Sequence, residues 1–158
     1  MKTNWKSYIA LILILMAFNV NAAGTAADAV MVHNPYARAV PPGQPNSAAF
    51  MHLKNSSDKA HAIVNAISDV SKVVELHTHT MQDGMMMMRR IEKIDIPANG
   101  DAMLKPGGLH IMFIGLKQDL KLDQQVSLTL EFEDGSKKTV KAPVKKIMMG
   151  GMMKGMKH

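Results

Sequence analysis

Hydrophobic and polar residues alternate in short stretches along most of the chain, and turn-forming residues separate the stretches. At 126–132, Val, Leu, Leu and Phe alternate with Ser, Thr and Glu, and this period of two is typical of a strand with one buried face. Further strands are predicted at 30–40 (interrupted by Pro35), 48–54, 60–67, 73–81, 85–91, 94–97, 109–116 and 138–144. No segment has a convincing amphipathic-helix pattern. Eight or nine short strands predict an all-β domain, a β-sandwich, with a closed barrel as the alternative.

The strongest turn signal is the Asp83-Gly84 pair, which separates the strands predicted at 73–81 and 85–91. Asp-Gly between two β-type stretches is typical of a tight hairpin. With a two-residue turn, Met81 would lie opposite Met86 and His79 opposite Met88. A longer loop would shift that register.

The two ends of the chain depart from the strand pattern. Residues 1–22 start with a basic segment, continue as an apolar run at 9–18 and end in Val-Asn-Ala. A run of that length is too short to cross a bilayer core of about 30 Å as a helix, so we predict a cleaved secretory signal, with an uncleaved membrane anchor as the alternative. Residues 23–145 are predicted to form the domain. Residues 146–158 are rich in Met and Gly without any periodicity, which predicts a flexible tail.

Composition narrows the possible functions. The chain carries a formal charge of +6, but its basic residues are scattered, so no nucleic-acid surface is predicted. It has no cysteine, which excludes disulfides, a cysteine-ligated blue-copper centre and most structural zinc sites. Methionine is unusually frequent, with 16 residues. Single methionines commonly fill protein cores, so the number of methionines does not indicate a function and only their placement is informative.

Sulfur and imidazole donors concentrate in three short stretches, at 77–81, 85–88 and 110–112. Residues two apart in a strand share a face, and the hairpin should bring the first two stretches together. A thioether is a soft, neutral donor that favours Cu(I) and is a poor ligand for Zn²⁺, Mg²⁺ or Ca²⁺. The four residues that we predict to bind Cu(I) are His77, Met88, His110 and Met112. Met85 and Met87 are expected to pack or to be exposed instead.

The spacing of these residues resembles that of the PCuAC family of periplasmic Cu(I)-binding proteins. The family pattern is a His, ten residues, a Met, twenty-one residues and then His-x-Met. His77, Met88, His110 and Met112 match all four positions. Supporting similarities to the family are the Lys-Pro-Gly-Gly-Leu-His run at 105–110 and the segments 36–43 and 49–51. The resemblance extends over about residues 30–145. One difference is Tyr36, which stands where the family is expected to have Trp.

The resemblance implies a cupredoxin-like or immunoglobulin-like β-sandwich and a periplasmic copper chaperone, not an enzyme. The expected partners are periplasmic proteins that donate or accept copper, such as the binuclear copper centre of cytochrome oxidase or an assembly factor. General periplasmic copper storage or tolerance is the alternative. Family members often have a Met- and His-rich tail that holds a second copper ion, although such a tail could also be merely disordered. The possible secondary ligands here are His79, Met81, Met86, Met148, Met149, Met152, Met153, Met156 and His158.

Two other classes of function are compatible with the sequence. A copper oxidase or monooxygenase would need more nitrogen ligands for a Cu(II)/Cu(I) cycle, and cleavage after Ala22 would leave no N-terminal His. A non-metal interaction module would use its methionines as an adhesive surface. The remaining histidines, His33, His52 and His61, occur singly with no soft donor nearby in sequence, so we interpret them as structural or surface residues.

Overall fold

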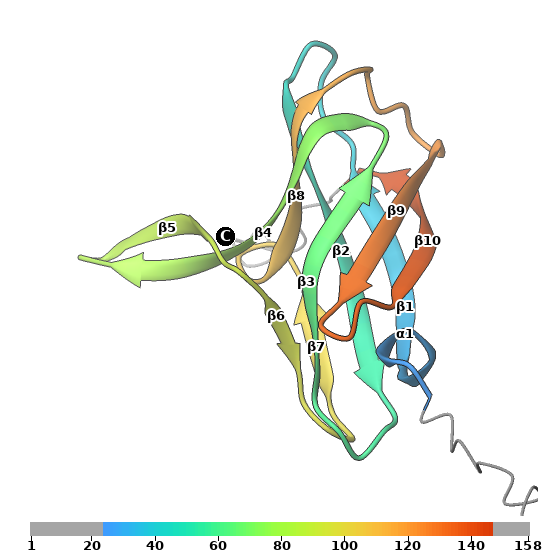
Figure 1. Ribbon diagram of the computed structural model, residues 1–158. Coiled ribbons are helices and arrows are strands. Elements are labelled where there is room, and N and C mark those ends of the chain that lie inside the picture. Colours follow the sequence, from blue (N-terminus) through green and yellow to red (C-terminus); the bar gives the residue numbers. More distant parts are fainter. Residues whose placement is uncertain (1–23, 147–158) are drawn as a thin grey trace, which may run out of the picture.

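The structure is a computed structural model that describes residues 24–146 (Figure 1). The predicted signal at 1–22 lies outside the described residues. So do the predicted tail ligands Met148, Met149, Met152, Met153, Met156 and His158. Within the described part, no helix is long and apolar enough to cross a membrane.

The described residues form ten strands and one short helix, α1 (Ala26–Ala29). In chain order, the strands are β1 (Val30–Arg38), β2 (Asn46–Asn55), β3 (His61–Ser68), β4 (Ser71–Gln82), β5 (Met85–Arg90), β6 (Ile94–Ile96), β7 (Asp101–Leu104), β8 (His110–Leu116), β9 (Gln125–Phe132) and β10 (Lys137–Lys145).

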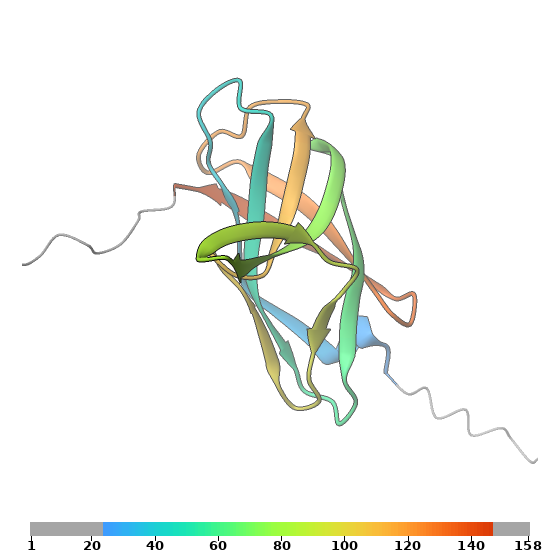
Figure 2. The same cartoon turned by 90° about the vertical axis from the view of Figure 1, so that its left-hand side faces the viewer.

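The strands form a β-sandwich, as predicted. The hydrogen-bonded order is β5-β4-β8-β2-β1-β10-β9-β3-β6, and β7 pairs with β2 beyond the end of β8. The two layers are joined where β1 runs parallel to β10, through the pairs Ala37–Val144 and Arg38–Lys145. The strand order has two ends, β5 and β6, so the barrel alternative is not what this chain forms. Figure 2 views the molecule with the β4–β5 hairpin toward the reader.

The core lies between the layers and follows the alternation read from the sequence. In β9, Val126, Leu128, Leu130 and Phe132 are all buried. Phe113 of β8 reaches the same core from the other layer and is fully buried. Burying one such side chain contributes about 1.5–3 kcal/mol, and the core fixes which face of each strand is left outside.

Two elements were not predicted. The helix α1 is a single turn, capped by Thr25, and its first two backbone N–H groups donate to Asp134 Oδ2 at 2.7 Å and Ser136 Oγ at 2.9 Å. The strand β7 has only four residues, too few to show a clear alternation. It pairs with one half of β2 while β8 pairs with the other half, so the chain between them turns sharply at 105–109.

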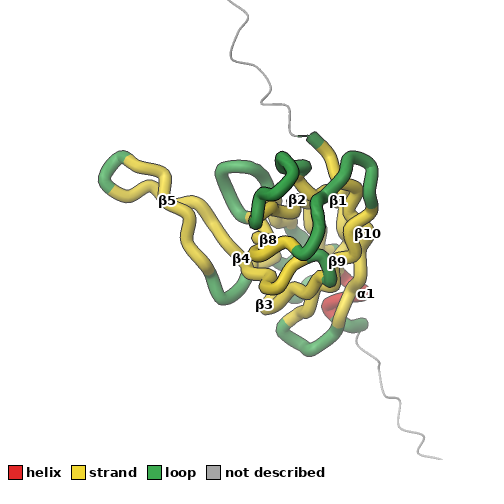
Figure 3. The backbone as a smooth tube through the Cα atoms, turned by 90° about the horizontal axis from the view of Figure 1, so that it is seen from above, coloured by secondary structure: helices red, strands yellow, loops and turns green. Residues whose placement is uncertain are grey.

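The β4–β5 hairpin projects from the sandwich (Figures 1 and 3). Asp83 and Gly84 form its two-residue turn, with φ angles of 52° and 76°, as a type I′ turn requires. Met81 pairs with Met86 and His79 pairs with Met88, so the predicted register is confirmed. Only the first half of β4 pairs with β8, and within residues 24–146 the single strand that pairs with β5 is β4.

Candidate metal centre

Three neighbouring strands, β5, β4 and β8, carry the predicted ligands on one face. His77 of β4 lies opposite His110 of β8, and His79 lies opposite Met88 of β5. Met112 is two residues from His110 and therefore shares its face. The alternate residues of β4 and β8 point into the core, so this second face is the outer surface of the sandwich at the base of the hairpin. The structure thus brings all four predicted ligands to one face.

Imidazole rings gather tightly there. The ring centroids of His77 and His110 are 5.7 Å apart, and those of His79 and His110 are 5.1 Å apart. The ring of Phe50, from β2, lies 6.2 Å from that of His110 and covers its other side. His110 itself is only 2% exposed, which is unusual for a polar side chain with no salt-bridge partner.

Each of the two central imidazoles has one nitrogen bound and one free. His110 Nδ1 donates to the carbonyl oxygen of Gly108 at 2.9 Å, and His77 Nε2 donates to Glu75 Oε2 at 2.8 Å. The opposite nitrogens, His110 Nε2 and His77 Nδ1, are buried and have no hydrogen-bond partner among residues 24–146. An unpartnered buried polar atom costs about 1–3 kcal/mol. Both nitrogens present a lone pair, as a metal ligand must.

Burial also keeps His110 neutral. Removal of the ring from water lowers the pKa of His110 below its ordinary value; the bond to Gly108 opposes this shift, while His79 and His77 add to it. A neutral imidazole has a lone pair available at neutral pH, so no proton has to leave before an ion can bind.

Glu75 is the important residue that our reading of the sequence missed. Its carboxylate receives the His77 N–H and lies 3.6 Å from Arg90 Nη1 of β5. A carboxylate on the far nitrogen of a ligating histidine fixes the tautomer and the ring orientation. The spacing Glu75-x-His77 on one strand face was a signal for this contact, because residues two apart are neighbours there.

A cavity of about 320 Å³ opens over this face, and His79, Met86, Met88, His110 and Met112 are among the residues that line it. His77 is not part of its lining. Met81 lies farther out on the hairpin and is 67% exposed. Of the possible secondary ligands in the described residues, the structure therefore brings His79 and Met86 to the cavity but leaves Met81 in solvent.

The donor set is poor in hard ligands. Among residues 24–146, no three His, Cys, Asp or Glu side chains come together in a way that could hold a metal ion. A site on this face needs the thioethers, which favour soft ions such as Cu(I) over Zn²⁺ or Mg²⁺.

Comparison with known proteins shows the family to which the chain belongs. Residues 30–144 match the family model described as "Putative lipoprotein LpqE-like". The chain is 37% identical to "Putative lipoprotein Lxx21020" of Leifsonia xyli subsp. xyli over 123 residues, which are 77% of this chain and 73% of the relative. It is 30% identical to "Uncharacterized protein RP573" of Rickettsia prowazekii over 146 residues, 84% of this chain and 79% of the relative.

Solved structures share the fold. The copper-bound PCuAC domain from PmoF2 superimposes with a TM-score of 0.66 at 21% identity, over 78% of this chain and 97% of that domain. The solution structure of CuI-DR1885 from Deinococcus radiodurans gives a TM-score of 0.63 at 36% identity, over 82% of this chain and 89% of that protein. The expected cupredoxin-like sandwich is thereby confirmed.

Proposed function

The chain belongs to the LpqE-like family, and from that premise we propose that it is an exported copper chaperone. It binds one Cu(I) ion through His77, Met88, His110 and Met112 and passes the ion to another protein. The observation that carries the proposal is a pair of buried imidazole nitrogens on neighbouring strands, His77 Nδ1 and His110 Nε2, for which the described part of the chain supplies no partner. Relatives in fold include PCuAC structures named as copper-bound and CuI-bound.

The proposed ligands suit Cu(I) in charge and softness. Two imidazoles and two thioethers are neutral, and thioether sulfur strongly prefers Cu(I) to the hard divalent ions. The carboxylate of Glu75 sits behind His77 and balances the charge of the ion without touching it. A site without thiolate cannot be lost to disulfide formation in an oxidising compartment.

His79 supplies a third imidazole that the family pattern does not include. It lines the cavity, and its Nδ1 makes only a long contact of 3.4 Å with the Gly108 carbonyl. Because that contact is weak, the ring can turn toward an ion held beside His110 at little cost. We assign His79 a supplementary role, in which it takes the place of an outgoing ligand while the ion is being transferred.

Transfer requires an exposed side of the site, and the hairpin provides one. Met88 is 46% exposed and Met86 59% exposed, so an acceptor can approach from the thioether side while His110 still holds the ion. The acceptor would be a copper protein of the same compartment, and the resemblance to the PCuAC family points to the binuclear copper centre of cytochrome oxidase. The second candidate function is general periplasmic copper storage or tolerance. An enzymatic role is not favoured, because two thioethers stabilise Cu(I) against a Cu(II)/Cu(I) cycle.

The location and the ends of the chain complete the proposal. The lipoprotein names of the family and of one relative fit export, and the segment 1–22 would direct it into the periplasm. The domain would comprise residues 23–145, and the tail 146–158 would offer further thioethers for a second copper ion.

Cu(I) binding by a chain shortened after Lys146 tests the ligand set. In anaerobic equilibrium dialysis, the shortened chain should bind one Cu(I) tightly, and the double variant His110→Gln/Met112→Leu should lose this site. Met87→Leu is the matched control, because Met87 lies opposite Thr80 on the other face of the hairpin. The assignment is wrong if the folded double variant, checked by circular dichroism, still binds one Cu(I) with unchanged affinity.

A further inference from the structure

The sandwich face that carries the candidate centre holds a second group of soft and imidazole donors. From the sequence we interpreted His33 and His52 as structural or surface residues that occur singly, and the structure places the two side by side. His33 of β1 lies directly opposite His52 of β2, with ring centroids 5.8 Å apart. Met103 of β7 lies opposite His52 on the other side. The three residues form a row across β7, β2 and β1, and directly opposed residues have Cβ atoms about 4.5–5.5 Å apart.

A carboxylate orients the central ring of this row. Asp101 Oδ2 accepts a hydrogen bond from His52 Nε2 at 2.9 Å. In the neutral ring the proton therefore lies on Nε2, and Nδ1 presents its lone pair. The arrangement repeats the one between Glu75 and His77, in which the carboxylate also holds Nε2 and leaves Nδ1 free. Asp101 and Met103 are two residues apart on β7, so both belong to the same face.

The row is open to solvent. The His52 side chain is 30% exposed, His33 is half-buried and Met103 is 46% exposed. His52 follows two residues after Phe50, whose ring lies against His110. The row and the candidate centre therefore lie on the same outer face of this layer, and an ion could reach either one from the same side.

We propose that His33, His52 and Met103 form a second copper site, with Asp101 as the positioning residue for His52. Two imidazoles and one thioether give a neutral three-donor set suited to Cu(I). The site is weaker than the four-ligand centre, because it has one thioether fewer and because Lys54 lies opposite Asp101 in the next row of the sheet. It lies wholly within the folded domain and does not involve the tail.

Methionine methyl resonances can report the two sites separately in the full chain. The protein would be labelled with ¹³C at the methionine ε-methyl groups and titrated with Cu(I) under anaerobic, reducing conditions. The Met88 and Met112 methyls should shift during the first equivalent. The Met103 methyl should shift at higher copper. In the double variant His33→Gln/His52→Gln, the Met103 shift should disappear and the bound copper should fall by one ion per chain, with the first step unchanged.

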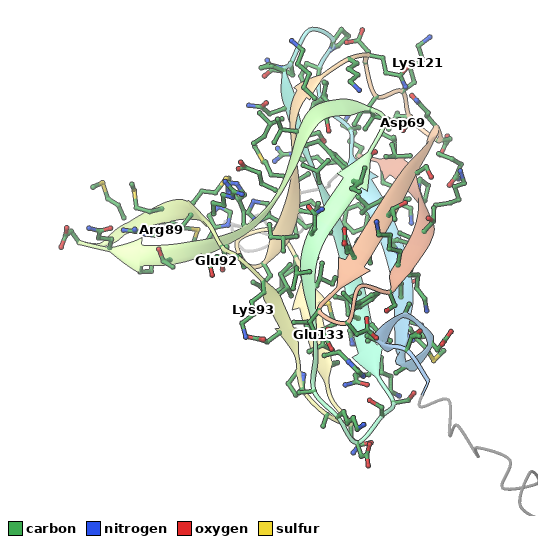
Figure 4. All side chains as sticks on the ribbon, in the orientation of Figure 1. Asp69, Arg89, Glu92, Lys93, Lys121 and Glu133 are labelled. Atoms are coloured by element: carbon green, nitrogen blue, oxygen red, sulfur yellow. The ribbon has the colours of Figure 1, made fainter. Side chains whose placement is uncertain are left out.

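His61→Gln provides a matched control. His61 also has a carboxylate partner, Glu133 (labelled in Figure 4) at 2.7 Å, but Ser57 Oγ contacts its other nitrogen at 3.1 Å, so this variant should keep the full copper count. A Met103 methyl that does not move when copper exceeds the number of all other sites would overturn the proposal, as would a shift that persists in the double variant. If the Met88 and Met112 methyl resonances do not shift, the proposed chaperone centre is wrong. The Met103 resonance still tests the second site, because it is observed separately.

Discussion

Replacing Glu75 with glutamine is expected to weaken Cu(I) binding while leaving the fold intact. The carboxylate accepts the His77 Nε2–H at 2.8 Å and lies 3.6 Å from Arg90 Nη1. Removing such an outer carboxylate generally lowers metal affinity about 10–100-fold. Glutamine keeps a neutral acceptor in place, so we expect a loss near tenfold, or about 1.4 kcal/mol. Alanine removes the acceptor as well, and its loss should approach 100-fold, about 2.8 kcal/mol.

The affinity would be measured by anaerobic competition with a chromophoric Cu(I) chelator, on chains shortened after Lys146. Glu131→Gln is the matched control, because Glu131 lies on β9 of the other layer and contacts Lys137 at 3.7 Å. The ¹⁵N shifts of His77 should show its ring changing from one tautomer to a mixture in Glu75→Ala. Unchanged copper affinity in Glu75→Ala, with the thermal unfolding midpoint preserved, would refute the positioning role.

Three further outcomes are expected. Phe113→Ala, at a fully buried core position, should lower the free energy of unfolding by about 3–5 kcal/mol in urea titrations. Gly84→Ala and Gly135→Ala each place a side chain at a positive φ, 76° and 79°, and each should lower the free energy of unfolding by about 1–2 kcal/mol. Competition titrations should show weaker Cu(I) binding only for Gly84→Ala, because this variant alters the hairpin. Hydrogen bonds from Ala26 N–H and then Ser136 lower the pKa of Asp134 below its ordinary value of 3.8. The stabilising effect of the Asp134 carboxylate is therefore present above pH 3.8 and is lost as the pH falls through the lowered value. Asp134→Asn should be less stable than the parent at pH 7, and urea titrations should show that the difference in free energy of unfolding between the two proteins shrinks in acid.

The sequence was most informative where structure depends on local contacts. The strand from Val126 to Phe132 follows from its strict alternation, and the hairpin register follows from the Asp83-Gly84 turn. In both cases the deciding residues lie within a few positions of one another. The candidate ligands could be grouped because two of the three donor stretches belong to that hairpin.

Features that depend on the register between separate strands could not be predicted. His33 and His52 meet only because β1 pairs with β2 in one register, and that register shifts between His33 and Tyr36, where Asn34 has a φ of 49°. Met103 joins them through β7, which pairs with β2 instead of with a sequence neighbour. A register error of one residue would turn any of these side chains to the opposite face.

The position of β5 at the edge of the sheet has a consequence for turnover of the protein. Among the described strands, β5 pairs with β4 alone, and the chain has no cysteine that could form a disulfide to it. An ion shared by Met88, His77 and His110 would link the projecting hairpin to β8, and 21 residues separate Met88 from His110 in the sequence. Binding that favours the native state adds about 4 kcal/mol when the free ion is a thousandfold above Kd. Copies without the ion would lack this stabilisation, and limited proteolysis should cut them faster than copper-loaded copies.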